Sequence, residues 1–514
     1  MTHPGTAPWW QDGVVYQVYP RSFADGDGDG SGDLAGIRAR LDHLSWLGVD
    51  AVWLSPVYRS PMADMGYDVA DHCAVDPAFG TLRDLDGLIG DAHVRGLRVL
   101  LDWVPNHTSD RHPWFLESRA SRGSRRRGWY VWRDGRDGKP PNNWRSAFGG
   151  PAWTWDAATR QWYLHLFLPQ QPDLNWGNPE VAAAMHDTLR FWLARGVDGF
   201  RVDAVHCVGK DPRLADQPAS LGDAAWAGLN DDPRTHEILR GVRRVVDAWP
   251  GERVVVGEVT LRGTSRIAAY YGRGDELHLV FNFLSLDAAW DAGAWRELID
   301  GVDREVGRAR AWPTWVLSNH DVVRFASRVG GGERRVRAAA VLLLTLRGTP
   351  FVYQGEELGL QDASVPAARR VDPGGRDGCR APIPWDPGPG HGWGEPPWLP
   401  FPPDAARRSV SAQREDRGSV LWLYRRLLAA RRSSPALRRG LVRLLDAPPG
   451  VLAYLRTWGG DRRVVVVSFT GAPARVALPG RWRVEVSARG DGGDAFTGEV
   501  PPEGAFLLAP AAGA

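Results

Sequence analysis

Gly199-Phe200-Arg201-Val202-Asp203-Ala204 is a short, largely apolar stretch that carries an arginine and an aspartate two residues apart. Its aromatic and β-branched residues favour a buried strand. Helical patterns near Pro179–Arg195 and Thr235–Ala248 flank it, and another apolar strand follows at Val254–Glu258. This alternation predicts a parallel sheet whose strands are joined by right-handed helical crossovers.

Strand-like segments of this kind recur along the chain, with helical patterns between most of them. The eight predicted strands are residues 14–19, 51–54, 97–102, 199–204, 254–258, 277–283, 314–318 and 349–353. Eight β/α units fit a closed barrel. The predicted fold class is therefore α/β, a (β/α)8 TIM barrel.

Two regions depart from the alternation, and 514 residues are too many for a single core. Residues after the third strand are rich in Gly, Pro, Arg and Trp, which predicts a small inserted domain or a lid. From about Gly440 short alternating strands indicate an all-β domain. The predicted domains are 1–102 and 176–435 for the barrel, 103–175 for an inserted domain B, and 436–514 for a C-terminal β-sandwich.

The bulk properties exclude several classes of function. Lys and Arg total 63 against 61 Asp and Glu, so no charge footprint favours nucleic acid or an anionic membrane. The three cysteines, Cys73, Cys207 and Cys379, lack metal-ligand spacing and are typical of reduced thiols. Residues 1–11 lack a secretory signal pattern, and no stretch of about 18 apolar residues occurs. We expect a cytoplasmic enzyme, and the sequence leaves its oligomeric state open.

Carboxylates and histidines gather where predicted strands end. These residues are Asp102 and His107 after the third strand, Asp203 on the fourth, Glu258 on the fifth, and His320 and Asp321 after the seventh. Any one aspartate could simply cap the next helix. Four such ends on one barrel instead predict an active site, because barrels catalyse at the C-terminal ends of their strands. Arg201 and Asp203 face the same side of one strand, so we expect the guanidinium to keep Asp203 ionised.

These four segments resemble, in order, the four signature regions of glycoside hydrolase family 13, the α-amylase family. Residues 15–23, 171–176 and 354–357 resemble further motifs of its α-glucosidase branch. The resemblance implies that Asp203 is the nucleophile, Glu258 the general acid and base, and Asp321 the transition-state stabiliser. Such retaining chemistry needs two carboxyls roughly 5–5.5 Å apart, with the pKa of the acid raised above that of the nucleophile.

The resemblance also implies a substrate site. His107, His320 and Arg201 would surround the sugar, Tyr67 would stack on it, and Asp68 would bind its hydroxyls. Arg380 resembles the arginine that pairs with this aspartate, and Arg376 is an alternative. A closed Asp68–Arg380 pocket would admit only a terminal glucose and make the enzyme exo-acting.

Residues 25–33 alternate acids with glycines, which lets several oxygens converge on one hard cation. The spacing is similar to that of an EF-hand, but a strand precedes it and Gly36 stands where that loop needs glutamate. The loop better resembles the first loop of bacterial α-glucosidases, which binds a structural Ca²⁺ or Mg²⁺. The ligands implied are Asp25, Asp27, Asp29 and Asp33 through their side chains and Ser31 through its carbonyl. A plain acidic turn is the alternative.

The function implied is an exo-acting retaining α-glucosidase that releases terminal α-glucose from maltose and short α-glucooligosaccharides. Ala204 follows the nucleophile, and in the family a small residue there accompanies α-1,4 preference whereas Val accompanies α-1,6 preference. The alternatives are an oligo-1,6-glucosidase and a glucosyl-transferring enzyme similar to sucrose isomerase or trehalose synthase. Amino-acid-transporter heavy chains share the fold, but they need a membrane helix and lose the catalytic acids.

Overall fold

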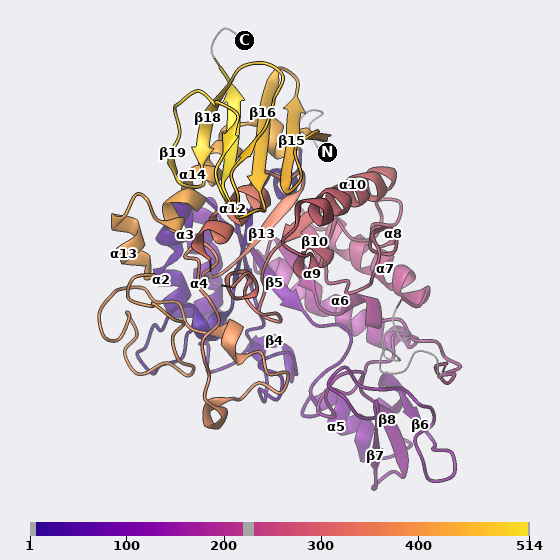
Figure 1. The fold of residues 1–514 in the computed structure, drawn as a ribbon. Helices are drawn as coiled ribbons and strands as arrows, with labels where there is room; N and C mark the ends of the chain where they lie inside the picture. The colour runs from indigo at the N-terminus through magenta and orange to yellow at the C-terminus, as the bar shows by residue number, and fades with distance from the viewer. Residues whose placement is uncertain (1–6, 219–230, 331, 512–514) are drawn as a thin grey trace.

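The computed structural model describes residues 7–218, 231–330 and 332–511. Its centre is a parallel sheet of eight strands in the order β11-β10-β9-β5-β2-β1-β13-β12 (Figure 1). The strands are β1 Val15–Val18, β2 Ala51–Leu54, β5 Arg98–Trp103, β9 Gly199–Val202, β10 Val254–Gly257, β11 Leu279–Val280, β12 Thr314–Val316 and β13 Thr349–Tyr353. Each predicted strand is present, and the barrel is confirmed.

The barrel is nearly closed, and its strand ends are level where the site lies. The Thr314 hydroxyl joins the two edge strands: it donates to the Val280 carbonyl at 2.8 Å and accepts from the Asn282 amide at 3.1 Å. On the opposite side, Val202 of β9 lies in register with Trp103 of β5 and Gly257 of β10. Residues that come directly after these three strands therefore lie at the same level along the barrel axis.

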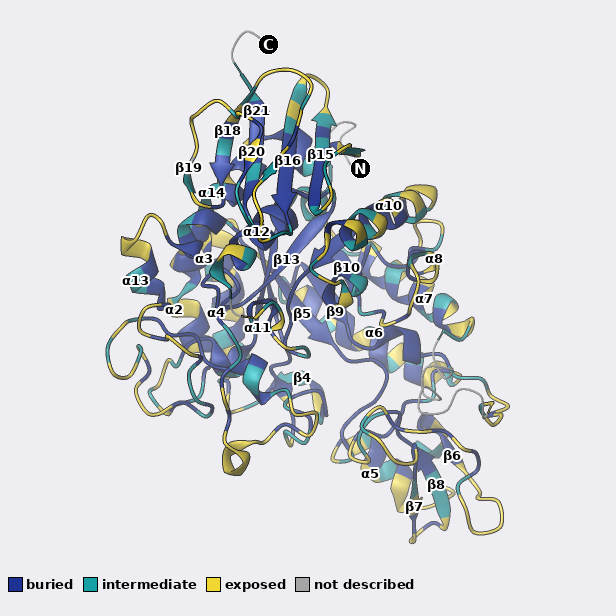
Figure 2. Ribbon diagram, in the orientation of Figure 1, coloured by how far each residue is buried: buried dark blue, intermediate teal, exposed yellow. Residues whose placement is uncertain are grey.

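Amphipathic helices cover the barrel and explain why its strands are almost entirely buried and mostly apolar (Figure 2). They include α4 Leu82–Val94, α6 Pro179–Ala194, α7 Arg234–Asp247, α10 Ala292–Arg308 and α12 Glu333–Thr345. Thr81 and Asp84 form the predicted capping box at the start of α4. Helix α12 is buried over its last ten residues because α14 (Val420–Ser433) and the C-terminal sheet both pack on it. No helix in the described ranges is long and apolar enough to cross a membrane.

Two antiparallel additions lie at opposite ends of the molecule (Figure 1). The insertion after β5 contains α5 Pro113–Ala120 and a sheet of β6 Trp132–Arg133, β8 Gln161–Leu164 and β7 Trp153–Asp156. The C-terminal sheet has the order β14-β15-β16-β21-β18-β19, and the pair β17–β20 packs with it around a shared apolar cluster. Its strands are β14 Leu441–Leu445, β15 Val451–Trp458, β16 Asp461–Ser468, β17 Ala474–Arg475, β18 Trp482–Ser487, β19 Gly490–Asp491, β20 Glu499–Val500 and β21 Ala505–Pro510.

Candidate functional site

One buried guanidinium joins the carboxylates of three neighbouring strand ends. Arg201, which is 1% exposed, donates through Nη1 to Asp102 Oδ1 at 2.6 Å and to Asp203 Oδ1 at 2.7 Å. Its Nη2 donates to Glu258 Oε2 at 2.7 Å. The strand register causes this convergence, because Arg201 lies directly beside Asp102 across the β5–β9 pair. Asp203 and Glu258 are thereby held against the same group.

The backbone after β9 adds a second link between these carboxylates. Ala204 adopts a left-handed conformation with φ of 40°, an uncommon state for a residue with a Cβ. The resulting sharp turn lets its amide donate to Glu258 Oε2 at 2.9 Å. Strained backbone of this kind is common at active sites, where the surrounding structure holds it in place.

Tyr67 and His320 form a stacked pair beside the guanidinium, with ring centroids 5.4 Å apart and planes 7° from parallel. The Gln17 amide lies 2.7 Å from His320 Nδ1, and the Tyr67 hydroxyl lies 2.6 Å from Nε2. The same hydroxyl donates to Asp102 Oδ2 at 3.2 Å. Burial lowers the pKa of His320 to about 3, so the ring is neutral at neutral pH.

Asp321 lies between two arginines from the loop after β13. Its Oδ1 accepts from Arg376 Nη1 at 2.8 Å and from Arg380 Nη2 at 3.2 Å. Asp372 holds both arginines in place through its Oδ1. Burial alone would raise the pKa of Asp321, but the surrounding positive charge holds it well below its usual range. His320 is neutral and therefore carries no positive charge at neutral pH. We assign the lowered pKa of Asp321 to the guanidinium groups of Arg376 and Arg380.

The predicted Asp68–Arg380 pair does not form between these two described residues. Asp68 is fully buried, and its oxygens accept from the Ala63 and Asp64 amides and the Ser60 hydroxyl, each at 2.9 Å. These bonds hold Asp68 within its own loop, and no ion pair joins it to an arginine in the described ranges. The pair that does form is Asp64–Arg376, at 2.6 Å. Arg376 was the alternative raised from the sequence, whereas Asp64 was missed, although it lies in the same loop four residues earlier.

His107 contacts this pair through Gln171. Its Nε2 lies 3.1 Å from the Gln171 amide nitrogen, which also donates to Asp64 Oδ2 at 3.0 Å. Burial lowers the pKa of His107 to about 3, so it is neutral. The structure thus gathers most of the predicted sugar-contacting residues around Asp321 and Arg201, and adds Asp64 and Gln171 to them.

Arg201 is not the only influence on the pKa of Asp203. Burial raises the pKa of this carboxyl, and although Arg201 lowers it, the nearby carboxylates of Glu258, Asp102 and Asp321 raise it further. The pKa of Asp203 in the free site therefore lies above its usual range. The single guanidinium of Arg201 thus offsets only part of the effect of burial and of the neighbouring negative charge on this carboxyl.

Lys210, one of only two lysines in the chain, ties the insertion to the barrel. Its Nζ lies 2.9 Å from Asp173 Oδ2, at the end of the insertion, and donates to Asn106 Oδ1 at 2.7 Å. The Asp173 side chain is fully buried, and that of Lys210 is 8% exposed. Asn106 precedes His107, so this ion pair supports the loop that carries a predicted sugar-contacting residue.

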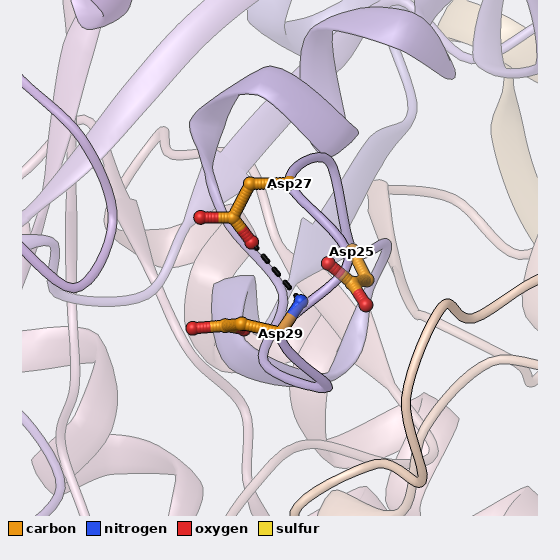
Figure 3. A group of neighbouring side chains, drawn as sticks. All are labelled: Asp25, Asp27 and Asp29. Carbon is orange, nitrogen blue, oxygen red and sulfur yellow. Dashed lines mark hydrogen bonds between the residues drawn. The ribbon is translucent and has the colours of Figure 1, made fainter.

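The acidic loop before α2 (Leu34–Ala39) brings three of the predicted cation ligands together (Figure 3). Oxygens of Asp25, Asp27 and Asp29 lie within 4.8 Å of one another. Asp33 lies outside this group, because it caps α2: its oxygens accept from the Gly36 amide at 2.6 Å and the Gly26 amide at 3.2 Å. The Ser31 amide donates to Asp29 Oδ1 at 2.7 Å. Three carboxylates form a donor set that suits a hard divalent cation.

A TIM barrel whose C-terminal face presents buried carboxylates around an arginine, beside stacked rings, defines a carbohydrate-cleaving enzyme, a glycoside hydrolase. Residues 17–440 match the alpha amylase catalytic domain. The chain is 42% identical to a probable α-glucosidase of Rhizobium meliloti, over 97% of this chain and 96% of that protein. It is 38% identical to an oligo-1,6-glucosidase of Parageobacillus thermoglucosidasius, over 92% of each. The chain belongs to the α-amylase family, and it is a glycoside hydrolase of the α-glucosidase type.

Solved structures agree with this assignment. The α-glucosyl transfer enzyme XgtA has a TM-score of 0.92 at 40% identity, covering 98% of this chain and all of that one. A variant of the trehalulose synthase MutB, solved with sucrose bound, has a TM-score of 0.91 at 34% identity over the same shares. The relatives thus include hydrolases and glucosyl-transferring enzymes.

The Lys210–Asp173 pair generates a stability prediction. Lys210→Met should cost about 3–5 kcal/mol of unfolding free energy, because it leaves the buried carboxylate of Asp173 without a positively charged partner. It should also raise KM more than it lowers kcat, since the insertion supports the sugar site. Urea unfolding and steady-state kinetics measure the two effects. Adding Asp173→Asn should restore part of the stability; an unchanged unfolding free energy in Lys210→Met would contradict the assignment.

The acidic loop generates a second prediction. If it holds a cation, a chelator should lower the thermal unfolding midpoint, because an ion that binds only the folded state stabilises that state. Added Ca²⁺ or Mg²⁺ should restore the midpoint. A variant with Asp27→Asn and Asp29→Asn serves as the matched control and should be insensitive to both treatments. Equal midpoints for the unmodified protein with and without chelator would identify the loop as a plain acidic turn.

Proposed function

We propose that the protein is an exo-acting, retaining α-glucosidase that releases terminal α-glucose from maltose and short α-glucooligosaccharides. The observation that carries the proposal is the attachment of Asp203 and Glu258 to one guanidinium. Two carboxyls held side by side on adjacent strand ends can act on the two faces of a glycosidic bond.

The proposed roles follow from the position and charge of each group. Asp203 attacks the anomeric carbon and forms a glucosyl ester, while Glu258 gives its proton to the departing oxygen. Glu258 then takes a proton from water, which attacks the ester and releases α-glucose. The two roles require Asp203 to be ionised and Glu258 to be protonated when the substrate is attacked. Asp321, kept ionised by its arginines, stabilises the positive charge of the oxocarbenium-like transition state.

The pocket proposed for the terminal glucose is built from Asp64, Arg376, His107 and His320, with Tyr67 as the stacking face. The Asp64–Arg376 ion pair takes the place expected for Asp68 and Arg380. An ion pair across the pocket leaves room for one sugar and favours attack from the non-reducing end. The proposed structural cation lies in the loop of Asp25, Asp27 and Asp29, where it would stabilise the fold.

Linkage preference is proposed from Ala204, which is buried in the turn next to Asp203. The small side chain favours an α-1,4 linkage, with an oligo-1,6-glucosidase as the alternative. Glucosyl transfer is a further alternative, because XgtA and MutB are similar over nearly the whole chain. Product analysis with maltose and added alcohols separates these outcomes.

The catalytic roles predict two distinct kinetic defects. Asp203→Asn should lower kcat by several orders of magnitude, since no nucleophile remains. Glu258→Gln should lower kcat for maltose by about 10²–10⁴-fold. It should partly spare aryl glucosides with good leaving groups, because these need little protonation. Both variants should unfold at temperatures close to that of the unmodified protein, and near-normal maltose turnover in Asp203→Asn would overturn the assignment.

The linkage proposal predicts a change in specificity. The first-formed product from maltose should be α-glucose, observed by NMR before mutarotation. Ala204→Val should lower the maltose-to-isomaltose ratio of kcat/KM by roughly tenfold, the size of effect that added methyl groups have in a pocket. Valine is β-branched and is therefore strained in this left-handed turn. Ala204→Ser, which adds one atom without branching, is the control for a substitution at this position. First-formed β-glucose would contradict retention, and isomaltose preference in the unmodified enzyme would assign it to the oligo-1,6-glucosidase group.

A further inference from the structure

A cavity of about 320 Å³ lies at the N-terminal ends of β1, β2 and β5, at the opposite end of the barrel from the carboxylates. Val14 and Asp50, just before β1 and β2, line it together with Arg98 at the start of β5. Arg98 is four residues before Asp102, a separation of about 13 Å along a strand. The cavity is therefore separate from the proposed catalytic site, and a ligand bound in it would be independent of the proposed function.

Positive charge dominates the cavity wall. Four guanidinium groups line it, from Arg98, Arg431, Arg432 and Arg438, against the two carboxylates of Asp12 and Asp50. Those carboxylates are already engaged: Asp50 accepts from Arg432 at 3.1 Å, and Asp12 pairs with Arg438 at 3.4 Å and with Arg439. Arg98 in turn donates to Asp198 Oδ1 at 3.1 Å, but Asp198 does not line the cavity. Among the lining side chains, arginines outnumber carboxylates, which favours an anion.

Arg431 is the group whose charge is least compensated. It is 1% exposed, and its terminal nitrogens donate only to backbone carbonyls, those of Leu344, Leu346, Gly348 and Leu437. Its Nε has no hydrogen-bond partner in the described ranges, and neither has the buried Nε of Arg438. No carboxylate of the described chain pairs with Arg431. A buried cation without a counter-charge is costly, so an anion in the cavity would lower that cost.

The rest of the wall indicates the class of ligand. Trp9 and Leu428 supply an apolar surface next to the guanidinium groups. Guanidinium groups suit the oxygens of a phosphoryl group, and an indole suits a flat apolar face such as that of a sugar ring. The cavity combines both kinds of contact.

The geometry points to an anion-binding site for a phosphoryl group at the base of the barrel, formed by Arg98, Arg431, Arg432 and Arg438. The ligand is inorganic phosphate or a small phosphate monoester such as a sugar phosphate. Because Arg431 and Arg432 belong to α14 and Arg438 to α15 (Pro435–Arg439), the ligand would join these helices to the barrel. Binding would therefore stabilise the folded protein.

The test is thermal unfolding of the full chain with increasing inorganic phosphate or glucose 6-phosphate, at constant ionic strength set with KCl. The unfolding midpoint should rise and saturate, and calorimetric titration of the unmodified protein should show binding. A lower half-saturating concentration of the ester would identify an organic phosphate as the ligand, whereas equal or weaker binding of the ester would identify the free ion.

The matched variant combines Arg98→Gln and Arg432→Gln, whose side chains are 45% and 59% exposed. Asp198, the buried partner of Arg98, keeps its contacts with His93 and Arg253 in this variant. The variant should bind at least about tenfold more weakly, since each lost charged hydrogen bond is worth about that factor. Arg304→Gln, an exposed arginine of α10 that also pairs with an aspartate, is the control and should bind normally. A rise in the unfolding midpoint that does not saturate and is equal in all variants would be general salt stabilisation and would overturn the proposal. The absence of binding heat in the calorimetric titration would also overturn it.

Discussion

The Arg201 guanidinium is the contact on which the rest of the site depends. It is buried in the barrel mouth and joins Asp102, Asp203 and Glu258, which come from three adjacent strands. Burying several carboxylates together is unfavourable unless a positive charge and directed hydrogen bonds hold them. Arg201 supplies both, and the level ends of β5, β9 and β10 make the convergence possible.

Further contacts around Arg201 hold the other charged groups of the site in place. Asp102 accepts from the Trp53 indole and the Tyr67 hydroxyl, which connects the guanidinium to the stacked rings. Asp321 is fixed by two arginines, and Asp372 fixes those arginines in turn. The Lys210–Asp173 pair attaches the inserted sheet to the same face. Charged groups therefore organise the site, while apolar packing of the helices organises the barrel that carries it.

The sequence predicted the barrel well because each strand is a short apolar run followed by a polar turn, as at Gly199–Ala204. It also predicted which strand ends carry carboxylates, since those positions follow from the strands themselves. It failed where loop conformation decides the contact. Asp68 and Asp64 lie in one loop, and only the folded turn shows that Asp68 accepts backbone amides while Asp64 meets Arg376. Asp33 was likewise expected to bind a cation, and the start of α2 uses it as a cap. Arg201 lowers the pKa of Asp203 as expected, but the opposing effects of burial and of the neighbouring carboxylates depend on the whole structure.

The central claim is that Asp203 forms a covalent bond to glucose beside Arg201. Trapping measures this directly: the enzyme is incubated with a fluorinated α-glucosyl fluoride that forms the glucosyl-enzyme quickly and releases it slowly. Intact-mass spectrometry and peptide mapping then locate the label. The account predicts one glucosyl adduct, on the peptide that contains Asp203, and its loss in Asp203→Asn. A label on Glu258 or Asp321, or turnover of the reagent with the nucleophile absent, would contradict it.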